Sequence, residues 1–142
     1  MTDRFFFKSA AIENFKAVRR SGRVAFTPLT VFIGNNGSGK SSLIEALETY
    51  RLMVLDGLDA AMGRWHGIEY IENQRARHRR EVAPGARESR ERTLTFRLKG
   101  RWGPGTFQVR LDASQELGTN QVGIENEMIE FPSLDAHGGE TG

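Results

Sequence analysis

The sequence predicts an α/β fold with a phosphate-binding loop, because three consecutive segments read as a strand, a loop and a helix. Residues 29–33 form an apolar and β-branched run, typical of a strand that is covered on both faces. Residues 34–39 are rich in glycine, which reaches backbone conformations closed to other residues. The pattern then becomes helical, with Leu43, Ile44 and Leu47 expected on one face. A strand, a glycine-rich loop and a helix in this order are the context of a P-loop.

Further strands and one more helical segment are expected around this unit. Helical spacing links Leu55, Leu58, Met62 and Trp65, although two glycines interrupt the pattern. The sequence KGRWGPG joins two strand candidates, and its glycines and proline favour a hairpin. The expected strands are residues 5–15, 23–26, 93–98, 106–111 and 122–131.

The composition fits one soluble globular domain. A chain of 142 residues can bury roughly two-thirds of its surface, and 27% charged residues are ordinary for this class. The net charge of +2 is too small to indicate a nucleic-acid partner by itself. Disulfides and thiolate metal sites are excluded because cysteine is absent, and no segment approaches the ~20 apolar residues of a membrane span. We expect a cytoplasmic protein without a membrane partner, with a nucleotide-binding lobe over residues 1–131 and a flexible tail over residues 132–142.

The loop satisfies the Walker A pattern of glycine, four residues, glycine, lysine and serine. Its backbone N–H groups are expected to point at a phosphate, with the positive end of the helix dipole behind them. Lys40 is expected to reach the β- and γ-phosphates, and the Ser41 hydroxyl to ligate Mg²⁺. A glycine-rich turn that binds nothing would have no use for Lys-Ser at this offset. The expected nucleotide-binding residues are Gly34, Asn35, Asn36, Gly37, Ser38, Gly39, Lys40, Ser41 and Ser42.

Hydrolysis needs a second carboxylate near the metal, and the sequence offers one poor candidate. Such an aspartate ends a strand beside the P-loop strand and holds the Mg²⁺ shell. Leu52-Met53-Val54-Leu55-Asp56 has the pattern of four apolar residues and an aspartate. However, Asp56 follows Lys40 so closely that the P-loop helix fills the interval, which leaves no room to return to a parallel strand. The catalytic residues are therefore unassigned.

Three segments together resemble the amino-terminal start of SMC/RecF-like AAA-family ATPases, which are ABC-type ATPase heads. They are IENFK at 12–16, FTPLT at 26–30 and GNNGSGKSSLIEAL at 34–47. Asn36 favours this class over ABC transporters, which more often have serine there. The later strand candidates resemble the antiparallel β-subdomain of the first lobe of such a head. The resemblance implies ATP and Mg²⁺ bound between two heads, and hydrolysis that moves DNA or an effector in DNA maintenance or phage defence.

The second half of such a head is not recognisable in the sequence. Its motifs are a Leu-Ser-Gly-Gly-type signature, an Asp-Glu pair and a switch histidine, and none of them is recognisable. A truncated gene product, an expression fragment or a split protein would each explain this. The resemblance therefore implies a first lobe that binds ATP and hydrolyses it only with a second lobe and a second copy of the head.

Several other residues carry weaker hypotheses. Asn14, Phe15 and Lys16 resemble the nucleoside-contacting edge of the family, but they equally fit a strand end with Phe15 in the core. Arginines recur through residues 75–92, where they suit DNA phosphates but alternate with glutamates as in a solvated face. The candidates for the glutamine that contacts metal and water are Gln74, Gln108 and Gln121, each of which also fits an ordinary surface position. The histidines, which are too scattered for a metal site, are His66, His78 and His137.

Two other functions stay open. A small nucleotide kinase also uses a P-loop, and phosphoryl transfer to a nucleoside monophosphate would distinguish it. A non-catalytic module would bind nucleotide or a partner and turn nothing over.

Overall fold

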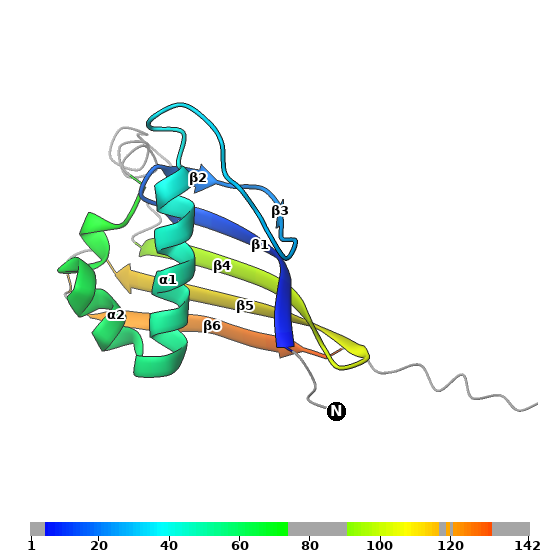
Figure 1. Ribbon diagram of the computed structural model, residues 1–142. Helices are drawn as coiled ribbons and strands as arrows, with labels where there is room; N and C mark the ends of the chain where they lie inside the picture. The colour runs from blue at the N-terminus through cyan, green and yellow to red at the C-terminus, as the bar shows by residue number, and fades with distance from the viewer. Residues whose placement is uncertain (1–4, 74–90, 117–118, 120, 132–142) are drawn as a thin grey trace, which may run out of the picture.

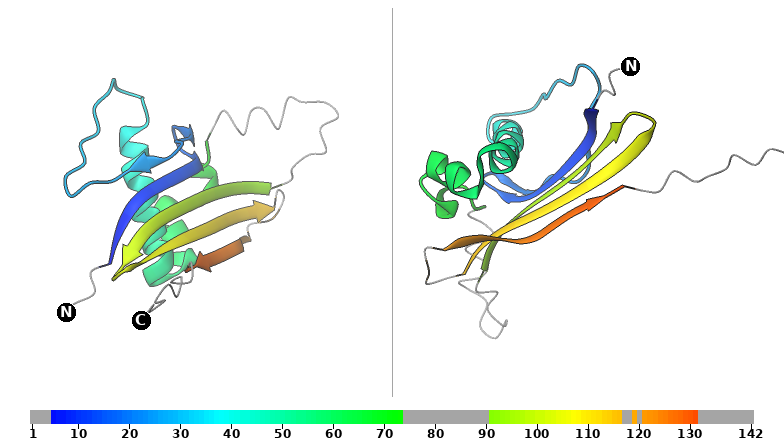
Figure 2. Two further views of the ribbon diagram at one scale, coloured as in Figure 1. Left: turned by 90° about the vertical axis from the view of Figure 1, so that its right-hand side faces the viewer. Right: turned by 90° about the horizontal axis from the view of Figure 1, so that it is seen from below.

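The computed structural model describes residues 5–73, 91–116, 119 and 121–131. Six strands form one antiparallel sheet, and the helices lie on one side of it (Figure 1, Figure 2). The helices are α1 (Lys40–Asp56) and α2 (Leu58–Trp65), followed by the 3₁₀ turn η1 (Ile68–Tyr70). The sheet order is β2 (Val18–Arg20), β1 (Phe5–Phe15), β4 (Glu91–Trp102), β5 (Gly105–Glu116) and β6 (Val122–Glu130), with β3 (Val24–Ala25) also paired with β1.

The β4–β5 hairpin is the longest paired unit of the sheet, and a glycine makes its packing possible. Twelve register pairs run from Glu91↔Glu116 to Trp102↔Gly105. A Cβ atom on Gly100 would overlap the Phe107 ring and the Phe6 carbonyl oxygen. The side chain of Phe107 therefore covers the position where any residue other than glycine would project.

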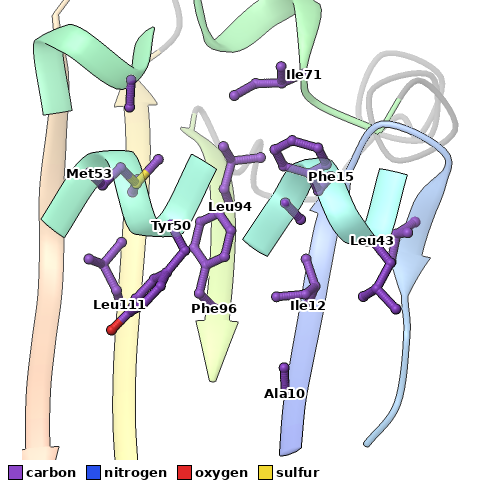
Figure 3. Close-up of a cluster of buried hydrophobic side chains, with 14 of the residues drawn as sticks. Ala10, Ile12, Phe15, Leu43, Tyr50, Met53, Ile71, Leu94, Phe96 and Leu111 are labelled. Carbon is purple, nitrogen blue, oxygen red and sulfur yellow. The ribbon is translucent and has the colours of Figure 1, made fainter. Parts of the chain in front are cut away.

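The core lies between α1 and the sheet (Figure 3). Spacings of three and four residues along α1 bring one stripe of its side chains onto the strands. Alternate residues of the strands face this stripe, because successive side chains of a strand point to opposite faces of the sheet. The buried residues of this layer include Leu43, Ala46, Tyr50 and Met53 on α1 and Ile12, Leu94, Phe96 and Leu111 on the strands.

Most of the expected elements are confirmed with changed bounds. The strand at residues 5–15 is β1, and the hairpin and the last strand are β4, β5 and β6. The helical pattern over residues 55–65 is confirmed, but it is divided at Gly57, whose φ is 92°. The strand β2 was not expected, and only residues 24 and 25 of the segment 23–26 pair. Residues 132–142 lie outside the described part of the chain.

The prediction of a strand at residues 29–33 is wrong for this structure. The segment runs as a loop from β3 toward the start of α1 (Figure 1), and Leu29, Val31 and Ile33 are 81%, 67% and 90% exposed. The Thr27 hydroxyl donates to the Leu29 carbonyl oxygen at 2.5 Å, but residues 31–33 make no backbone hydrogen bond with any other described residue. No described strand lies alongside to pair with them, so the apolar pattern has no sheet to enter.

The expected face of the P-loop helix is only partly correct. Leu43 is buried and Leu47 packs against the core, but Ile44 is 47% exposed. Ile44 therefore lies on a second apolar side of α1 that the described residues leave uncovered. No helix in the described ranges is long and apolar enough to cross a membrane.

An apolar groove of about 840 Å³ opens between α1 and the hairpin end of the sheet. Aromatic rings line it, with the Phe7 and Phe107 centroids 5.8 Å apart and the Trp102 and Phe131 centroids 6.1 Å apart. Tyr50 also contributes to the lining, and burial raises the pKa of its phenol, with a smaller contribution from the Glu127 carboxylate. The groove leaves Trp102 and Phe131 more than half exposed.

Candidate nucleotide-binding site

The glycine-rich loop turns at two positions that only glycine adopts readily. Gly37 and Gly39 have φ of 82° and 92°, in the left-handed region that strains other residues. The Ser38 amide donates to the Asn35 carbonyl oxygen at 3.2 Å and closes a turn. A Cβ atom on Gly34 would lie 3.0 Å from the Ser38 hydroxyl oxygen, so this glycine lets the two sides of the loop approach. The left-handed φ of these two glycines is what the motif predicts at its turns.

The loop leads directly into α1 and leaves the first amides of the helix free. Gly39 is the N-cap and has no side chain to cap them, and the first helical bond runs from the Leu43 amide to the Gly39 carbonyl oxygen at 2.9 Å. The amides of Lys40, Ser41 and Ser42 make no hydrogen bond with another described residue. Unpaired amides at the positive end of a helix dipole are a site for a phosphate.

The Lys40 side chain folds back over the loop. Its ammonium donates to the carbonyl oxygens of Gly34 at 2.5 Å and Asn35 at 2.7 Å, and to the Ser38 hydroxyl at 3.2 Å. All three acceptors are neutral. A phosphate oxygen in the loop would offer the ammonium a charged acceptor, and charge-assisted hydrogen bonds are about twice as strong as neutral ones.

The two serines after Lys40 have different surroundings. The Ser41 side chain is exposed, and its hydroxyl bonds to no other described residue. Ser42 is buried, and its hydroxyl accepts from the Ala17 amide at 3.4 Å, in the turn between β1 and β2. Ser41 therefore has the free oxygen that a metal ligand requires, whereas Ser42 can offer a phosphate only its amide.

The β1–β2 turn lies against the start of α1, which the sequence did not predict. Its contact with the loop includes Val18, whose Cγ2 atom would lie 3.3 Å from a Cβ on Gly39. Phe15 is fully buried, so the core interpretation of this residue is confirmed. The Asn14 side chain donates to the Thr93 carbonyl oxygen at 3.1 Å, and the Lys16 ammonium bonds to Glu45 at 2.7 Å. No spacing rule in the sequence could have linked these distant partners.

The described residues bring no catalytic carboxylate to the loop. Asp56 is the last residue of α1, about 24 Å from Lys40 at the usual helical rise, so the argument against it is confirmed. No group of three histidines, aspartates or glutamates suited to a metal occurs in the described part of the chain. Gln108 lies on β5 with its side chain on the face turned away from α1, and Gln121 precedes β6 at the far edge of the sheet.

Several weaker candidates lie wholly or partly outside the described residues. His66 is described, and it ends α2 with φ 63° as a cap residue. Glu91 and Arg92 begin β4, at the end of the basic run over residues 75–92. The candidates that lie outside are Gln74, His78, His137 and residues 75–90 of the basic run.

Comparison with known families bears on the first part of the chain. Residues 7–50 match the family model of the AAA ATPase domain. The matched segment contains most of β1, all of β2 and β3, the glycine-rich loop and most of α1, and it includes every residue that the motif assigns to nucleotide. The match supports an AAA-family ATPase and, with it, ATP binding. No curated protein and no solved structure matches the chain significantly.

Proposed function

We propose that residues 34–42 bind ATP with Mg²⁺, and that the chain is the first lobe of an SMC/RecF-like, ABC-type ATPase head. The observation that carries the proposal is the Lys40 ammonium, which lies over the loop with only neutral acceptors, beside helix amides that no described residue satisfies. An anion bound between the ammonium and these amides would accept hydrogen bonds from both. The AAA ATPase match at residues 7–50 favours ATP as the source of that anion.

The Mg²⁺ ion has one protein ligand in this proposal. The Ser41 hydroxyl is exposed at the first turn of α1, next to the expected position of the β- and γ-phosphates. Mg²⁺ usually keeps several waters and binds through few protein oxygens together with substrate phosphates. One serine, two phosphate oxygens and water are consistent with that preference.

Two uncovered apolar surfaces support the interpretation as one lobe of a larger head. Along residues 29–33 the side chains alternate, with Phe32 packed against the core and Val31 and Ile33 exposed. This is the alternation of a strand that has one face covered and its backbone unpaired. The groove beside α1 and the exposed Ile44 add apolar area that a single soluble domain rarely leaves open. We propose that a second lobe pairs with residues 29–33 and covers this area.

Hydrolysis in this proposal belongs to the completed head. The second lobe would supply the carboxylate of the Mg²⁺ shell, and a second head would close the site over the γ-phosphate. The resemblance to SMC/RecF-like heads places such an ATPase in DNA maintenance or phage defence.

Titration calorimetry of ATP with Mg²⁺ tests the binding proposal. We expect Lys40→Ala to weaken binding by about 1.5–3 kcal/mol, the scale of a charge-assisted hydrogen bond. Lys99→Ala is the matched control, because Lys99 is exposed on β4 and distant from the loop in the sheet. Ser41→Ala should weaken binding in Mg²⁺ and have little effect in excess chelator. Equal ATP affinity for folded wild type and Lys40→Ala would refute the assignment.

A further inference from the structure

The strand β6 forms one edge of the sheet, and within the described part of the chain its backbone is paired on one side only. The sheet order places β5 beside it and no described strand on its other side (Figure 1). No backbone hydrogen bond joins β6 to a described residue outside β5. Since the backbone groups of a strand point alternately to its two sides, about half of the N–H and C=O groups of β6 are directed at the free edge.

A bulge divides β6 and leaves one regular stretch along this edge. The register with β5 is continuous over residues 126–130 and shifts between Asn126 and Ile124, so Glu125 has no register partner. A bulge interrupts the ladder and bends its strand. Residues 126–130 are therefore the part of β6 on which another strand can continue the sheet.

The side chains of this stretch alternate between acids and apolar groups on the two sides of the sheet. Glu127 lies on the side that faces α1 and Glu130 on the opposite side, as do their register partners on β5. Between them lie Met128 and Ile129, which are 43% and 54% exposed. Both glutamates are also exposed. The edge thus presents the pattern acid–apolar–apolar–acid, with one acid and one apolar group on each side of the sheet.

We propose that an extended segment of a partner protein adds to β6 as a further strand, with the pattern basic–apolar–apolar–basic opposite residues 127–130. Backbone hydrogen bonds supply the affinity in this mode of recognition, and alternate side chains supply the specificity. Opposite charges that face each other across two strands stabilise a sheet, whereas like charges destabilise it. A second copy of β6 is therefore a poor partner, because it brings the same acids to the edge. The basic–apolar–apolar–basic pattern reads the same in both chain directions, so the added strand can run either way.

The proposed site is separate from the nucleotide loop and does not rest on ATP binding. The strand β6 lies at the opposite edge of the sheet from β2, which contains Val18, the residue beside Gly39. Occupation of the β6 edge should therefore leave ATP affinity unchanged.

NMR titration of the chain with the capped peptide Thr-Lys-Val-Val-Lys-Thr tests the proposal. We expect the amide signals of residues 126–130 to shift on binding, and their exchange with solvent to slow because pairing satisfies the amides at the edge. The peptide Thr-Lys-Pro-Pro-Lys-Thr keeps the charge, but its prolines cannot donate to a ladder. Thr-Glu-Val-Val-Glu-Thr reverses the charge. Both control peptides should bind at least about fivefold more weakly, the scale of one favourable cross-strand pair.

The double variant Glu127→Gln/Glu130→Gln should weaken binding of the lysine–valine peptide by about 2- to 30-fold, since each cross-strand charge pair is worth up to about fivefold. Asp56→Asn/Asp59→Asn is the matched control, because it removes the same charge from exposed positions of α1 and α2. It should bind the peptide as the wild type does. All of these positions are exposed, so both double variants should fold and should keep wild-type ATP affinity.

Several outcomes would overturn the proposal. Absence of peptide binding would do so, as would equal losses in the two double variants. Equal affinity for the lysine–proline peptide would show that charge attracts the peptide without strand pairing. Shifts centred on residues 29–33 in place of residues 126–130 would assign the peptide to that unpaired segment and would contradict a site on β6.

Discussion

The Lys16 ammonium bonds to the Glu45 carboxylate at 2.7 Å and joins the β1–β2 turn to the second turn of α1. The same ammonium lies 3.6 Å from the centre of the Trp65 ring, so one lysine connects the turn to both α-helices. Asn14 and Lys16 both have positive φ, at 63° and 46°. The turn keeps this conformation because the Lys16 amide bonds to the Ile71 carbonyl oxygen at 2.6 Å. The position of the helix that carries the nucleotide loop therefore depends on a turn far from it in sequence.

A double-mutant cycle on Lys16 and Glu45 should detect this connection. We expect Lys16→Met and Glu45→Gln to show a coupling energy of about 1 kcal/mol, at the upper end for exposed pairs because both side chains are partly buried. Urea unfolding of the wild type, both single variants and the double variant measures it. The weak Arg64–Glu48 contact at 3.5 Å, with both side chains more than half exposed, is the control cycle and should give a smaller coupling. Similar couplings in the two cycles would mean that burial and the Trp65 contact contribute nothing.

Gly39 is predicted to be the most sensitive glycine of the nucleotide loop. Its φ of 92° strains any side chain, and a Cβ would press on Val18 at 3.3 Å. We expect Gly39→Ala to lower the free energy of unfolding by about 1–2 kcal/mol and to weaken ATP binding, because the helix amides would shift. Urea unfolding and calorimetry measure the two effects.

Gly63 in α2 is a glycine whose replacement by alanine should stabilise the protein. Its φ is not positive, and an added Cβ would meet nothing within 4 Å. Gly63→Ala should therefore raise stability, by about 0.4–1 kcal/mol, and leave ATP affinity unchanged. A Gly39→Ala protein as stable as the wild type would contradict the strained conformation of the loop.

The sequence predicted those elements whose patterns are completed by nearby residues. Alternation along β4 and β5 was sufficient for the hairpin because the two strands are adjacent in the chain and their core residues face α1. The positive φ of Gly37 and Gly39 was predictable because the motif places glycine where the backbone must turn. Asp56 was rejected from chain length alone, and the structure agrees.

The errors occur where the pattern requires a partner that the described residues do not contain. Residues 29–33 have the composition of a buried strand, but a strand exists only when another backbone pairs with it. The wrong prediction for Ile44 has the same cause, since helix periodicity shows that a face is apolar but not which residues cover it. The contacts of Lys16 were missed for a different reason, because ion pairs between distant segments leave no mark on local spacing.

The same substitution should have a small effect on stability at Val31 and a large one at Phe32. Val31 is 67% exposed, so Val31→Ser should change the free energy of unfolding by no more than about 0.5 kcal/mol. Phe32 packs against the core with its side chain partly buried, so Phe32→Ser should cost about 1–3 kcal/mol, less than truncation of a fully buried ring. Urea unfolding compares the two. A large loss of stability in Val31→Ser would mean that residues 29–33 are already paired in this chain.

This chain alone should bind ATP far better than it hydrolyses it. Lys40 and the free amides of α1 can hold the phosphates, but holding the ground state does not lower the barrier to attack by water. The barrier falls when a water is positioned, a second carboxylate approaches the Mg²⁺ and new charge is stabilised in the transition state. The described residues bring no such carboxylate to the loop, since Asp56 is at the opposite end of α1. An arginine supplied in trans is alone worth about 10³–10⁵ in rate in related P-loop proteins, so turnover should stay near background.

Phosphate release from the purified chain measures this turnover, with Lys40→Ala as the control for contaminating ATPases. The wild type and Lys40→Ala should release phosphate at the same low rate, although only the wild type binds ATP tightly. A second lobe, supplied as a separate polypeptide or joined to the chain, should raise the rate of the wild type and leave the Lys40→Ala protein inactive, because the loop must first hold the nucleotide. Steady turnover by the chain alone at about 1 s⁻¹ or faster, within the ordinary range of enzymes and abolished by Lys40→Ala, would show that the site is already complete.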